Sequence, residues 1–358
     1  MKTKKISKSM KTNLITYGIA AAAFIVVEVM LATGSMSSLM KGLLVPLCTY
    51  AILAVSLNLT VGILGELSLG HAGFMCIGAF SGAFFSVCTA DKIGSDLVRF
   101  IIAIIIGAVC AGIFGLLIGI PVLRLRGDYL AIVTLAFGEI IKNVINALYV
   151  GIDSRGLHFS LKDTSSLNLE TDGKVIINGA QGISGTPNDS TFVIGFILLI
   201  ITLVVVLNLI HSRTGRAVMA VRDNRIAAES IGINITKYKL LAFSVSAALA
   251  GMAGVLYAHN LSTLTALPKN FGYNMSIMIL VFVVLGGIGN IWGSMVAAVI
   301  LTLLPELLRG LNDYRMLIYA VVLIVMMLFN WSPKAKEFRS RLSLKKLFGK
   351  NKQAKEAK

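Results

Sequence analysis

The stretch SRTGRAVMAVRDNRIAAESIGINITKYKLLAFSVSAALAGMAG, residues 212–254, has a basic first half and an apolar second half and joins two hydrophobic segments. Four arginines lie among small apolar residues in the first half, and Gly232 ends that pattern. Glycine commonly follows the end of a helix, and basic loops between hydrophobic segments face the cytosol. The stretch therefore predicts a cytosolic amphipathic helix that leads into a membrane helix.

One side of the predicted cytosolic helix is polar. Arg222, Arg225 and Glu229 follow one another at intervals of three and four residues, which places them on one helix face. The apolar residues of the opposite side are Val221, Ala228 and Ile231. One face can therefore pack on the membrane helices while the other meets a partner.

The composition is that of a polytopic integral membrane protein. Hydrophobic residues make up 56% of the 358 residues, and the mean hydropathy is +0.83. Because the apolar runs are long enough to cross a bilayer, we predict an all-α helical bundle of about ten transmembrane helices. The predicted spans are 14–32, 43–64, 67–90, 97–120, 129–150, 191–210, 240–258, two spans within 275–308, and 316–331.

The distribution of Lys and Arg sets the predicted topology. Of the 33 basic residues, 23 fall in residues 1–13, 123–128, 211–239 and 333–358. The positive-inside rule places these segments, and both termini, in the cytosol. Because no aromatic residues are interleaved with the charges, nucleic acid is not an expected partner. The predicted organisation is a basic cytosolic N-terminus (1–13), a transmembrane domain (14–331) with an outer loop (151–190) and a cytosolic loop (211–239), and a basic cytosolic tail (332–358).

The first apolar run has two interpretations. Residues 14–32 follow five lysines, as the apolar part of a secretory signal peptide does. The run is longer than such a region, contains Glu28 and has no clear A-x-A cleavage site. These features favour a retained signal-anchor helix over a cleaved signal peptide.

Two Gly-rich stretches interrupt the apolar spans. Residues 58–74, NLTVGILGELSLGHAGF, place the polar residues Asn58, Glu66, Ser68 and His71 at or near membrane depth, and GGIGNIWG (286–293) divides the last apolar block. Glycine lowers helix propensity and permits close backbone approach. The first stretch is therefore either a broken segment that lines a path or a tightly packed turn.

Two further spans have distinctive residues. Glu139 and Lys142 lie near the middle of span 129–150, where a lone charge costs about 2.5–3.5 kcal/mol. Their spacing allows either a pair that neutralises itself or a pair that faces a wet path. In span 240–258, Ala247, Gly251 and Gly254 predict a seam for close helix packing.

The outer loop, residues 151–190, is the longest polar segment between spans, and loops of this length are usually functional or disordered. Gly179, Gly182, Gly185 and Pro187 indicate defined turns near its end. The Ser-, Thr- and Asn-rich part that precedes them can be mobile. No strand is predicted.

The sequence contains none of the catalytic motifs that would indicate an enzyme. The phosphate loop G-x-x-x-x-G-K-[ST], H-E-x-x-H and G-x-S-x-G are all absent. The histidines and cysteines lack metal-ligand spacing. We therefore predict no catalytic residue, no metal and no cofactor. Transport driven by another polypeptide, a gradient-driven carrier or channel, and a structural scaffold remain as classes, and the Arg-rich cytosolic helix favours the first.

Five blocks of the sequence resemble the permease subunits of branched-chain amino-acid ABC importers, and among their two permease types the LivM type. The blocks are NLTVGILGELSLGHAGFMCIGAF (58–80), LRLRGDYLAIVTLAFGEI (123–140), GAQGISGTP (179–187), GRAVMAVRDNRIAAESIGINITKYKLLAFSVSAALAGMAGVLYA (215–258) and VLGGIGNIWG (284–293). Asn290 and Ser294 stand where relatives often have Ser and Pro.

The resemblance implies a non-catalytic subunit in the cell membrane of a prokaryote. It implies two ABC ATPase subunits, a second related permease and an extracytoplasmic amino-acid-binding protein as partners. The solute would be leucine, isoleucine or valine, although urea, amides, nucleosides and sugars are handled by similar systems.

The resemblance also implies roles for particular residues. A coupling helix at 215–232 would contact the ATPase through Arg216, Arg222, Asp223, Arg225, Glu229 and Gly232. The translocation path is predicted to include Asn58, Glu66, Ser68, Gly70, His71 and Glu139. Outer-loop docking is predicted at Gly182, Ser184 and Gly185.

Overall fold

The computed structural model describes residues 24–31, 33–34, 36–90, 92–125, 127–170, 173–314, 317–318, 320–321, 323–325 and 328. Eight helices among them are long and apolar enough to cross a membrane. They correspond to the eight spans predicted between residues 43 and 308, so the helical, polytopic membrane fold is confirmed. The spans predicted at 14–32 and 316–331 are only partly described, and the predicted segments 1–13 and 332–358 lie outside the described residues.

The long helices begin at side-chain caps where the sequence offers them. The side-chain oxygens of Ser37, Thr191 and Asn234 each accept a hydrogen bond from the N–H of the third residue that follows. The long helices are α2 (Ser38–Asn58), continued by the π-helix η1 (Leu59–Leu64), α3 (His71–Cys88), α4 (Asp96–Val122), α5 (Asp128–Ala147), α6 (Phe192–His211), α9 (Ile235–Ala258), α11 (Tyr273–Gly286) and α12 (Ile291–Leu307). The short helices are η2 (Ser165–Leu167), η3 (Gly179–Gln181), α7 (Arg213–Asp223), α8 (Arg225–Ser230), α10 (Pro268–Phe271) and η4 (Leu308–Tyr314).

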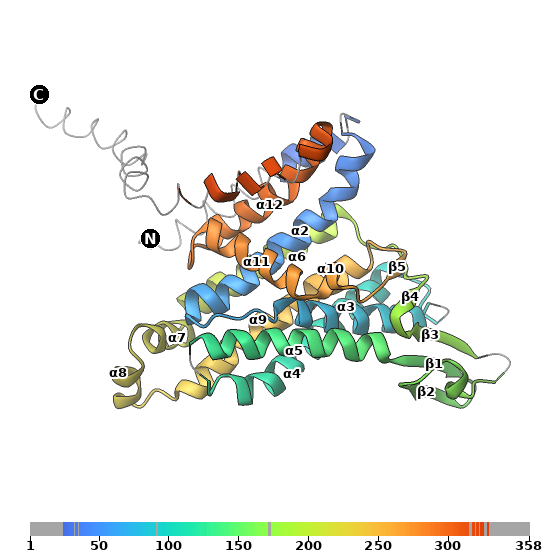
Figure 1. Ribbon diagram of the computed structural model, residues 1–358, viewed down its shortest axis with the longest axis horizontal. Coiled ribbons are helices and arrows are strands. Elements are labelled where there is room, and N and C mark those ends of the chain that lie inside the picture. Colours follow the sequence, from blue (N-terminus) through green and yellow to red (C-terminus); the bar gives the residue numbers. More distant parts are fainter. Residues whose placement is uncertain are drawn as a thin grey trace, which may run out of the picture. The chain divides into compact units, whose positions relative to one another are not determined.

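Helix α9 packs against α2, α3 and α4 in the interior of the bundle (Figure 1). Small residues make this possible. A Cβ added at Gly78 would lie 2.3 Å from the Cα of Gly251, and one added at Gly254 would lie 2.1 Å from the carbonyl oxygen of Met75. Helix backbones approach this closely only where no side chain intervenes. The predicted small-residue seam of span 240–258 is confirmed.

The outer loop contributes four strands of a small antiparallel sheet. The strands are β1 (Tyr149–Asp153), β2 (Gly156–Ser160), β3 (Lys174–Asn178), β4 (Ile183–Ser184) and β5 (Thr263–Leu264), in the order β2-β1-β3-β4-β5. In register, Val150 faces Phe159 on β2 and Ile177 on β3, and Ile183 faces Leu264. Because β5 follows α9, the sheet fastens the loop to the membrane helices. These strands were not predicted, because each has at most five residues and only a short alternation.

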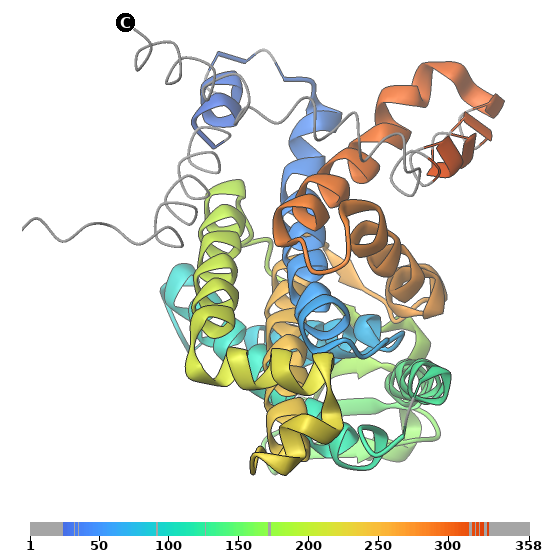
Figure 2. The ribbon, with the colours of Figure 1, turned by 90° about the vertical axis from the view of Figure 1, so that its left-hand side faces the viewer.

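Loops that were predicted on one side of the membrane lie together. Helices α7 and α8 lie at the opposite end of the bundle from the sheet, and they cross the ends of the long helices (Figures 1 and 2). Gly127, from the predicted cytosolic turn 123–128, borders a cavity that Val221 and Arg225 also line. The described residues from Ile300 onward belong to a second unit, in which Arg309 pairs with Glu306 at 3.0 Å.

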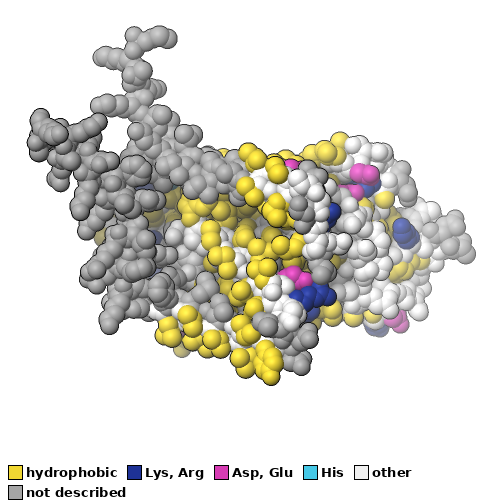
Figure 3. All heavy atoms as spheres, turned by 90° about the horizontal axis from the view of Figure 1, so that it is seen from above, with side chains coloured by type: hydrophobic (Ala, Val, Ile, Leu, Met, Phe, Trp, Pro, Cys, Tyr) yellow, Lys and Arg dark blue, Asp and Glu magenta, His cyan; other side chains and the backbone are white. Residues whose placement is uncertain are grey.

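Exposed apolar side chains follow one face of α4. They recur every three or four residues at Leu97, Ile101, Ile105, Val109, Ile113, Leu116 and Ile120. Figure 3 shows hydrophobic side chains over much of the middle of another face of the molecule, whereas charged and other side chains prevail toward the sheet. Such surfaces suit contact with lipid or with another membrane subunit.

Candidate translocation and coupling site

The first Gly-rich stretch interrupts a membrane helix. Helix α2 continues as the π-helix η1 to Leu64, and residues 65–70 are not helical before α3 begins at His71. Gly65 has a φ of 79°, a conformation that favours glycine. The chain then returns to the end of α2, where the Nε2 of His71 lies 2.7 Å from the Oγ of Ser56.

The second Gly-rich stretch meets the first. Helix α11 ends at Gly286, and the turn before α12 packs on η1 through Gly289. The side-chain oxygen of Asn58 accepts a hydrogen bond from the Gly289 N–H at 2.9 Å, and its nitrogen donates to the Oγ of Ser294 at 2.7 Å. A Cβ added at Gly62 would lie 2.4 Å from the Gly289 nitrogen. The two interruptions therefore form one contact, which the sequence analysis did not predict.

Hydroxyl groups connect this contact to α9. The Oγ1 of Thr60 donates to Ser246 at 2.8 Å, and Ser246 donates to the carbonyl oxygen of Ser56 at 2.6 Å. Asn58, Ser68 and His71 are buried, and within the described residues the hydroxyl of Ser68 has no hydrogen-bond partner. Buried polar groups are usually paired, so Ser68 is the exception in this segment.

Close packing accounts for the glycines that follow. A Cβ added at Gly70 would lie 2.2 Å from the carbonyl oxygen of Thr134, and one added at Gly73 would lie 2.8 Å from the Cα of Gly138. The Thr134 hydroxyl also accepts a hydrogen bond from the Leu69 N–H at 3.0 Å. The packed-turn interpretation thus explains these positions, and a path-lining role for Gly70 stays a prediction.

The two predicted acidic path residues lie in separate ion pairs. Glu139 pairs with Lys142 on α5, so the predicted self-contained pair is confirmed, and Glu139 also accepts a hydrogen bond from the Tyr273 N–H at 2.7 Å. Glu66 pairs with Lys239 of α9 near the cytosolic helices. Asn58 is the last residue of α2, and His71 contacts Ser56 in the last turn of that helix. The carboxylates of Glu66 and Glu139 instead pair with Lys239 and Lys142.

The cytosolic element consists of two helices, so the prediction of one helix over 215–232 is wrong. Asn224 separates α7 from α8 with an extended backbone, and its side chain accepts a hydrogen bond from the Ala227 N–H at 3.0 Å. Asparagine competes in this way with continuous helix and caps a new one. Gly232, with a φ of 84°, follows α8.

The apolar side of this element divides into a buried part and an exposed part. Val221 and Ala228 are buried as predicted, but Ile231 is 74% exposed, which contradicts its predicted place on the packed side. Ile226 is 81% exposed and was not predicted as a site residue. Two isoleucines therefore project from α8 beside the polar residues.

Among the predicted coupling residues, Arg222 differs from the others. The side chains of all five charged residues are exposed, including that of Arg222 (36%), and Arg216 donates to the carbonyl oxygen of His211 at 3.0 Å. The Nη1 of Arg222 donates to the carbonyl oxygen of Gly62 at 3.0 Å. This side chain therefore reaches from α7 to the π-helix.

The predicted docking residues of the outer loop lie beside β5. Gly182 has a φ of 70°, and a Cβ there would lie 1.9 Å from the carbonyl oxygen of Leu264. Ser184 is exposed, and the Gly185 N–H donates to the carbonyl oxygen of Ser262 at 3.1 Å. These residues hold the edge of the sheet against the segment that follows α9.

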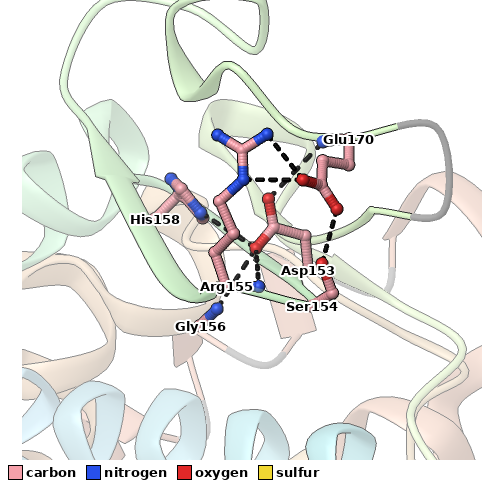
Figure 4. Close-up of polar contacts among 6 residues, drawn as sticks. All are labelled: Asp153, Ser154, Arg155, Gly156, His158 and Glu170. Atoms are coloured by element: carbon pink, nitrogen blue, oxygen red, sulfur yellow. Dashed lines mark hydrogen bonds and ion pairs between the residues drawn. The ribbon is translucent and has the colours of Figure 1, made fainter.

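Asp153 organises the turn between β1 and β2 (Figure 4). Its carboxylate accepts hydrogen bonds from the N–H groups of Arg155 (2.8 Å) and Gly156 (3.2 Å) and lies 3.0 Å from the Nε2 of His158. Burial alone would raise the pKa of Asp153, but these contacts and the Glu170 N–H hold this pKa below its usual value. Arg155 pairs with Glu170 at 2.5 Å, which joins the hairpin to the rest of the loop.

The described fold is a multi-pass helical membrane protein whose discontinuous helices meet in its interior. The chain belongs to the family described as branched-chain amino acid transport system / permease component, which matches residues 39–329.

The chain is 34% identical over 294 residues to the high-affinity branched-chain amino acid transport system permease protein LivM of Salmonella typhimurium. The aligned region covers 80% of this chain and 67% of that protein. It is 34% identical over 316 residues to LivM of Escherichia coli (85% and 72%). It is 25% identical over 205 residues to the nucleoside ABC transporter permease protein NupC of Lactococcus lactis (55% and 60%). No solved structure matches the chain.

Proposed function

We propose that the protein is the transmembrane permease subunit of an ABC importer for branched-chain amino acids. In this proposal it forms part of the translocation path in the inner or plasma membrane of a prokaryote and has no catalytic role. Two separate ATPase subunits hydrolyse ATP, and an extracytoplasmic binding protein delivers leucine, isoleucine or valine. Family membership and the names of the LivM relatives support this function.

The exposure of Ile226 and Ile231 is the observation that carries the proposal. Large apolar side chains that project beside charged residues are typical of protein interfaces. Helix α8 is too short to cross a membrane and lies beside the basic turn 123–128, on the predicted cytosolic side. We assign α8, its C-cap residue Ile231 and the exposed side of α7 as the ATPase-docking surface. Ile226 and Ile231 are its apolar anchors, and Arg216 and Asp223 of α7 and Arg225 and Glu229 of α8 are the polar contacts around them. Gly232 ends this surface.

The proposed path runs along the contact between the two helix interruptions. Asn58, Ser68, Gly70 and His71 would meet the zwitterionic head of the solute when the interruptions separate, and the unpaired hydroxyl of Ser68 supports this assignment. Glu66 and Glu139 would border the path through their ion pairs.

The remaining partners are assigned to other surfaces. We propose that Gly182, Ser184 and Gly185 shape the outer surface on which the binding protein docks. The exposed apolar face of α4 is a candidate contact for the second, related permease. The predicted domain limits 14–331 are retained for the permease domain.

The test reconstitutes the chain with its two ATPase subunits, the second permease and the binding protein, and measures ATPase copurification and leucine uptake in vesicles. We expect Ile226→Asp to insert normally but to lose both. The matched control is Leu161→Asp, a similarly exposed apolar residue (67%) in the outer loop, which keeps ATPase copurification. Uptake without any ATPase, or an Ile226→Asp variant that retains both activities, would refute the proposal. Because one relative is a nucleoside permease, labelled nucleoside is the competing solute in the same assay.

A further inference from the structure

We propose that Arg222 is a transmission residue, which links the ATPase-docking helices to the interrupted membrane helices and does not itself hold the ATPase. This inference rests on the proposed function, and it changes the role that the sequence analysis predicted for Arg222. The geometry of its side chain carries the argument.

The stem of Arg222 is fitted to the end of η1. A Cβ added at Gly65 would lie 2.6 Å from the Cγ of Arg222 and 3.2 Å from its Cδ, so the missing side chain of Gly65 makes room for the arginine. Gly65 also has the positive φ that ends the π-helix. Gly65 thus both ends the π-helix and leaves space for the aliphatic part of the Arg222 side chain.

The guanidinium of Arg222 binds a helix-terminal carbonyl. The Gly65 and Glu66 N–H groups both donate to the carbonyl oxygen of Thr60. The carbonyl of Gly62 receives its hydrogen bond from the Nη1 of Arg222 at 3.0 Å. Carbonyls in the last turn of a helix commonly need such partners, and basic side chains supply them.

The other side of the guanidinium is held on α7. The Nε and Nη2 of Arg222 both donate to one carboxylate oxygen of Asp223, at 3.0 and 2.8 Å. Asp223 therefore orients the group whose Nη1 reaches Gly62. A movement of α7 displaces this guanidinium together with its neighbour.

The contact continues from Gly62 into the second interruption. The backbone of Gly62 lies against Gly289, and Asn58, one turn earlier, binds both Gly289 and Ser294. A displacement at Arg222 is thereby passed to the turn between α11 and α12. Every step of this connection is a close contact between named atoms, and packed, hydrogen-bonded contacts of this kind can carry coupling between distant sites.

The experiment uses the full complex in nanodiscs and compares Arg222→Met with Arg225→Met. Methionine keeps an apolar stem over Gly65 and removes the guanidinium. We expect Arg222→Met to copurify with the ATPase as the wild type does, to lose coupled uptake about 10-fold or more, and to hydrolyse ATP without a response to loaded binding protein. We expect Arg225→Met to weaken ATPase copurification instead.

Two additional measurements separate transmission from a structural defect. Arg222→Lys, which can donate one hydrogen bond to the same carbonyl, should recover part of the uptake. Amide exchange at residues 286–294 should change on ATP binding in the wild type and not in Arg222→Met, at equal melting temperatures.

Loss of ATPase copurification in Arg222→Met would make this residue a partner contact and overturn the inference, as would normal coupled uptake. A wild-type chain that binds no ATPase would instead refute the proposed function itself.

Discussion

The substitution Gly62→Ala tests whether the two helix interruptions depend on their direct contact. The new Cβ would lie 1.9 Å from the side-chain oxygen of Asn58 and 2.4 Å from the nitrogen of Gly289. Both distances are far below a normal contact, and the second neighbour is backbone. The Asn58 amide and the turn before α12 must therefore move apart.

The cost follows from the contacts that are lost. Overpacking a well-packed interior costs about 1–3 kcal/mol. Displacing Asn58 also breaks its hydrogen bonds to Gly289 and Ser294, each worth about 0.5–1.5 kcal/mol. The higher helix propensity of alanine offsets at most about 1 kcal/mol. These ranges combine to about 1–6 kcal/mol, and we expect a net destabilisation in the middle of that range, about 2–4 kcal/mol.

The assay is thermal unfolding in detergent, followed with a thiol-reactive fluorophore, because Cys48 and Cys76 are buried in the folded protein. At about 2 °C per kcal/mol, the expected decrease in melting temperature is roughly 4–8 °C. Gly42→Ala is the matched control, because Gly42 lies in α2, the helix that η1 continues, and a Cβ there would meet no atom of the described residues within 4 Å. We expect this control to unfold at or slightly above the wild-type temperature. A Gly62→Ala protein as stable as Gly42→Ala would refute the contact.

Three further predictions concern charge and backbone conformation. Glu139→Gln leaves the Lys142 side chain, which is 7% exposed, without its carboxylate partner. Breaking a buried ion pair costs about 3–5 kcal/mol, and because Glu139 is 24% exposed we expect a loss at the lower end of that range in thermal unfolding, largely recovered by the added change Lys142→Met. Because the folded-state pKa of Asp153 is depressed, its contribution to the outer sheet is complete above the unfolded pKa of about 3.9 and disappears as the pH falls through the folded value. The protection factors of the sheet amides, which are exchange rates corrected for the intrinsic pH dependence of amide exchange, should therefore fall on acidification from pH 7 to 3 in the wild type but change little over that range in Asp153→Asn. Gly182→Ala should abolish the β4–β5 pairing, measured by proteolysis, whereas Gly185→Ala, with a similar positive φ but open space around it, should retain the pairing.

The spans were predictable because each carries its own signal. A run of about twenty apolar residues must cross the bilayer as a helix, whatever the rest of the chain does. The Glu139 and Lys142 pair was predictable for the same reason, since both residues lie on one helix face. Local signals also located both helix interruptions at glycines.

The contacts between distant segments could not be predicted in this way. Asn58 and Gly289 are 231 positions apart, and no residue pattern in either stretch indicates that the two are in contact. The hydroxyls of Thr60, Ser246 and Ser294 gave no signal, because serine and threonine commonly satisfy their own helix backbone. The contact of the Arg222 side chain with Gly62 could not be predicted either. A continuous helix would place Arg222 and Arg225 on the same face, and only the break at Asn224 gives the two side chains different surroundings.

The π-helix explains why a single arginine can have a large effect at this point. A regular helix end is held by several backbone hydrogen bonds. At the end of η1, two N–H groups donate to the single carbonyl oxygen of Thr60, and the carbonyl of Gly62 accepts its hydrogen bond from the side chain of Arg222. A hydrogen bond from a charged donor contributes about 1.5–3 kcal/mol, and typical coupling energies between sites are about 1–3 kcal/mol. In the proposed mechanism, a guanidinium–carbonyl bond that formed in only one state of the ATPase would be sufficient to bias the interrupted helices between two arrangements.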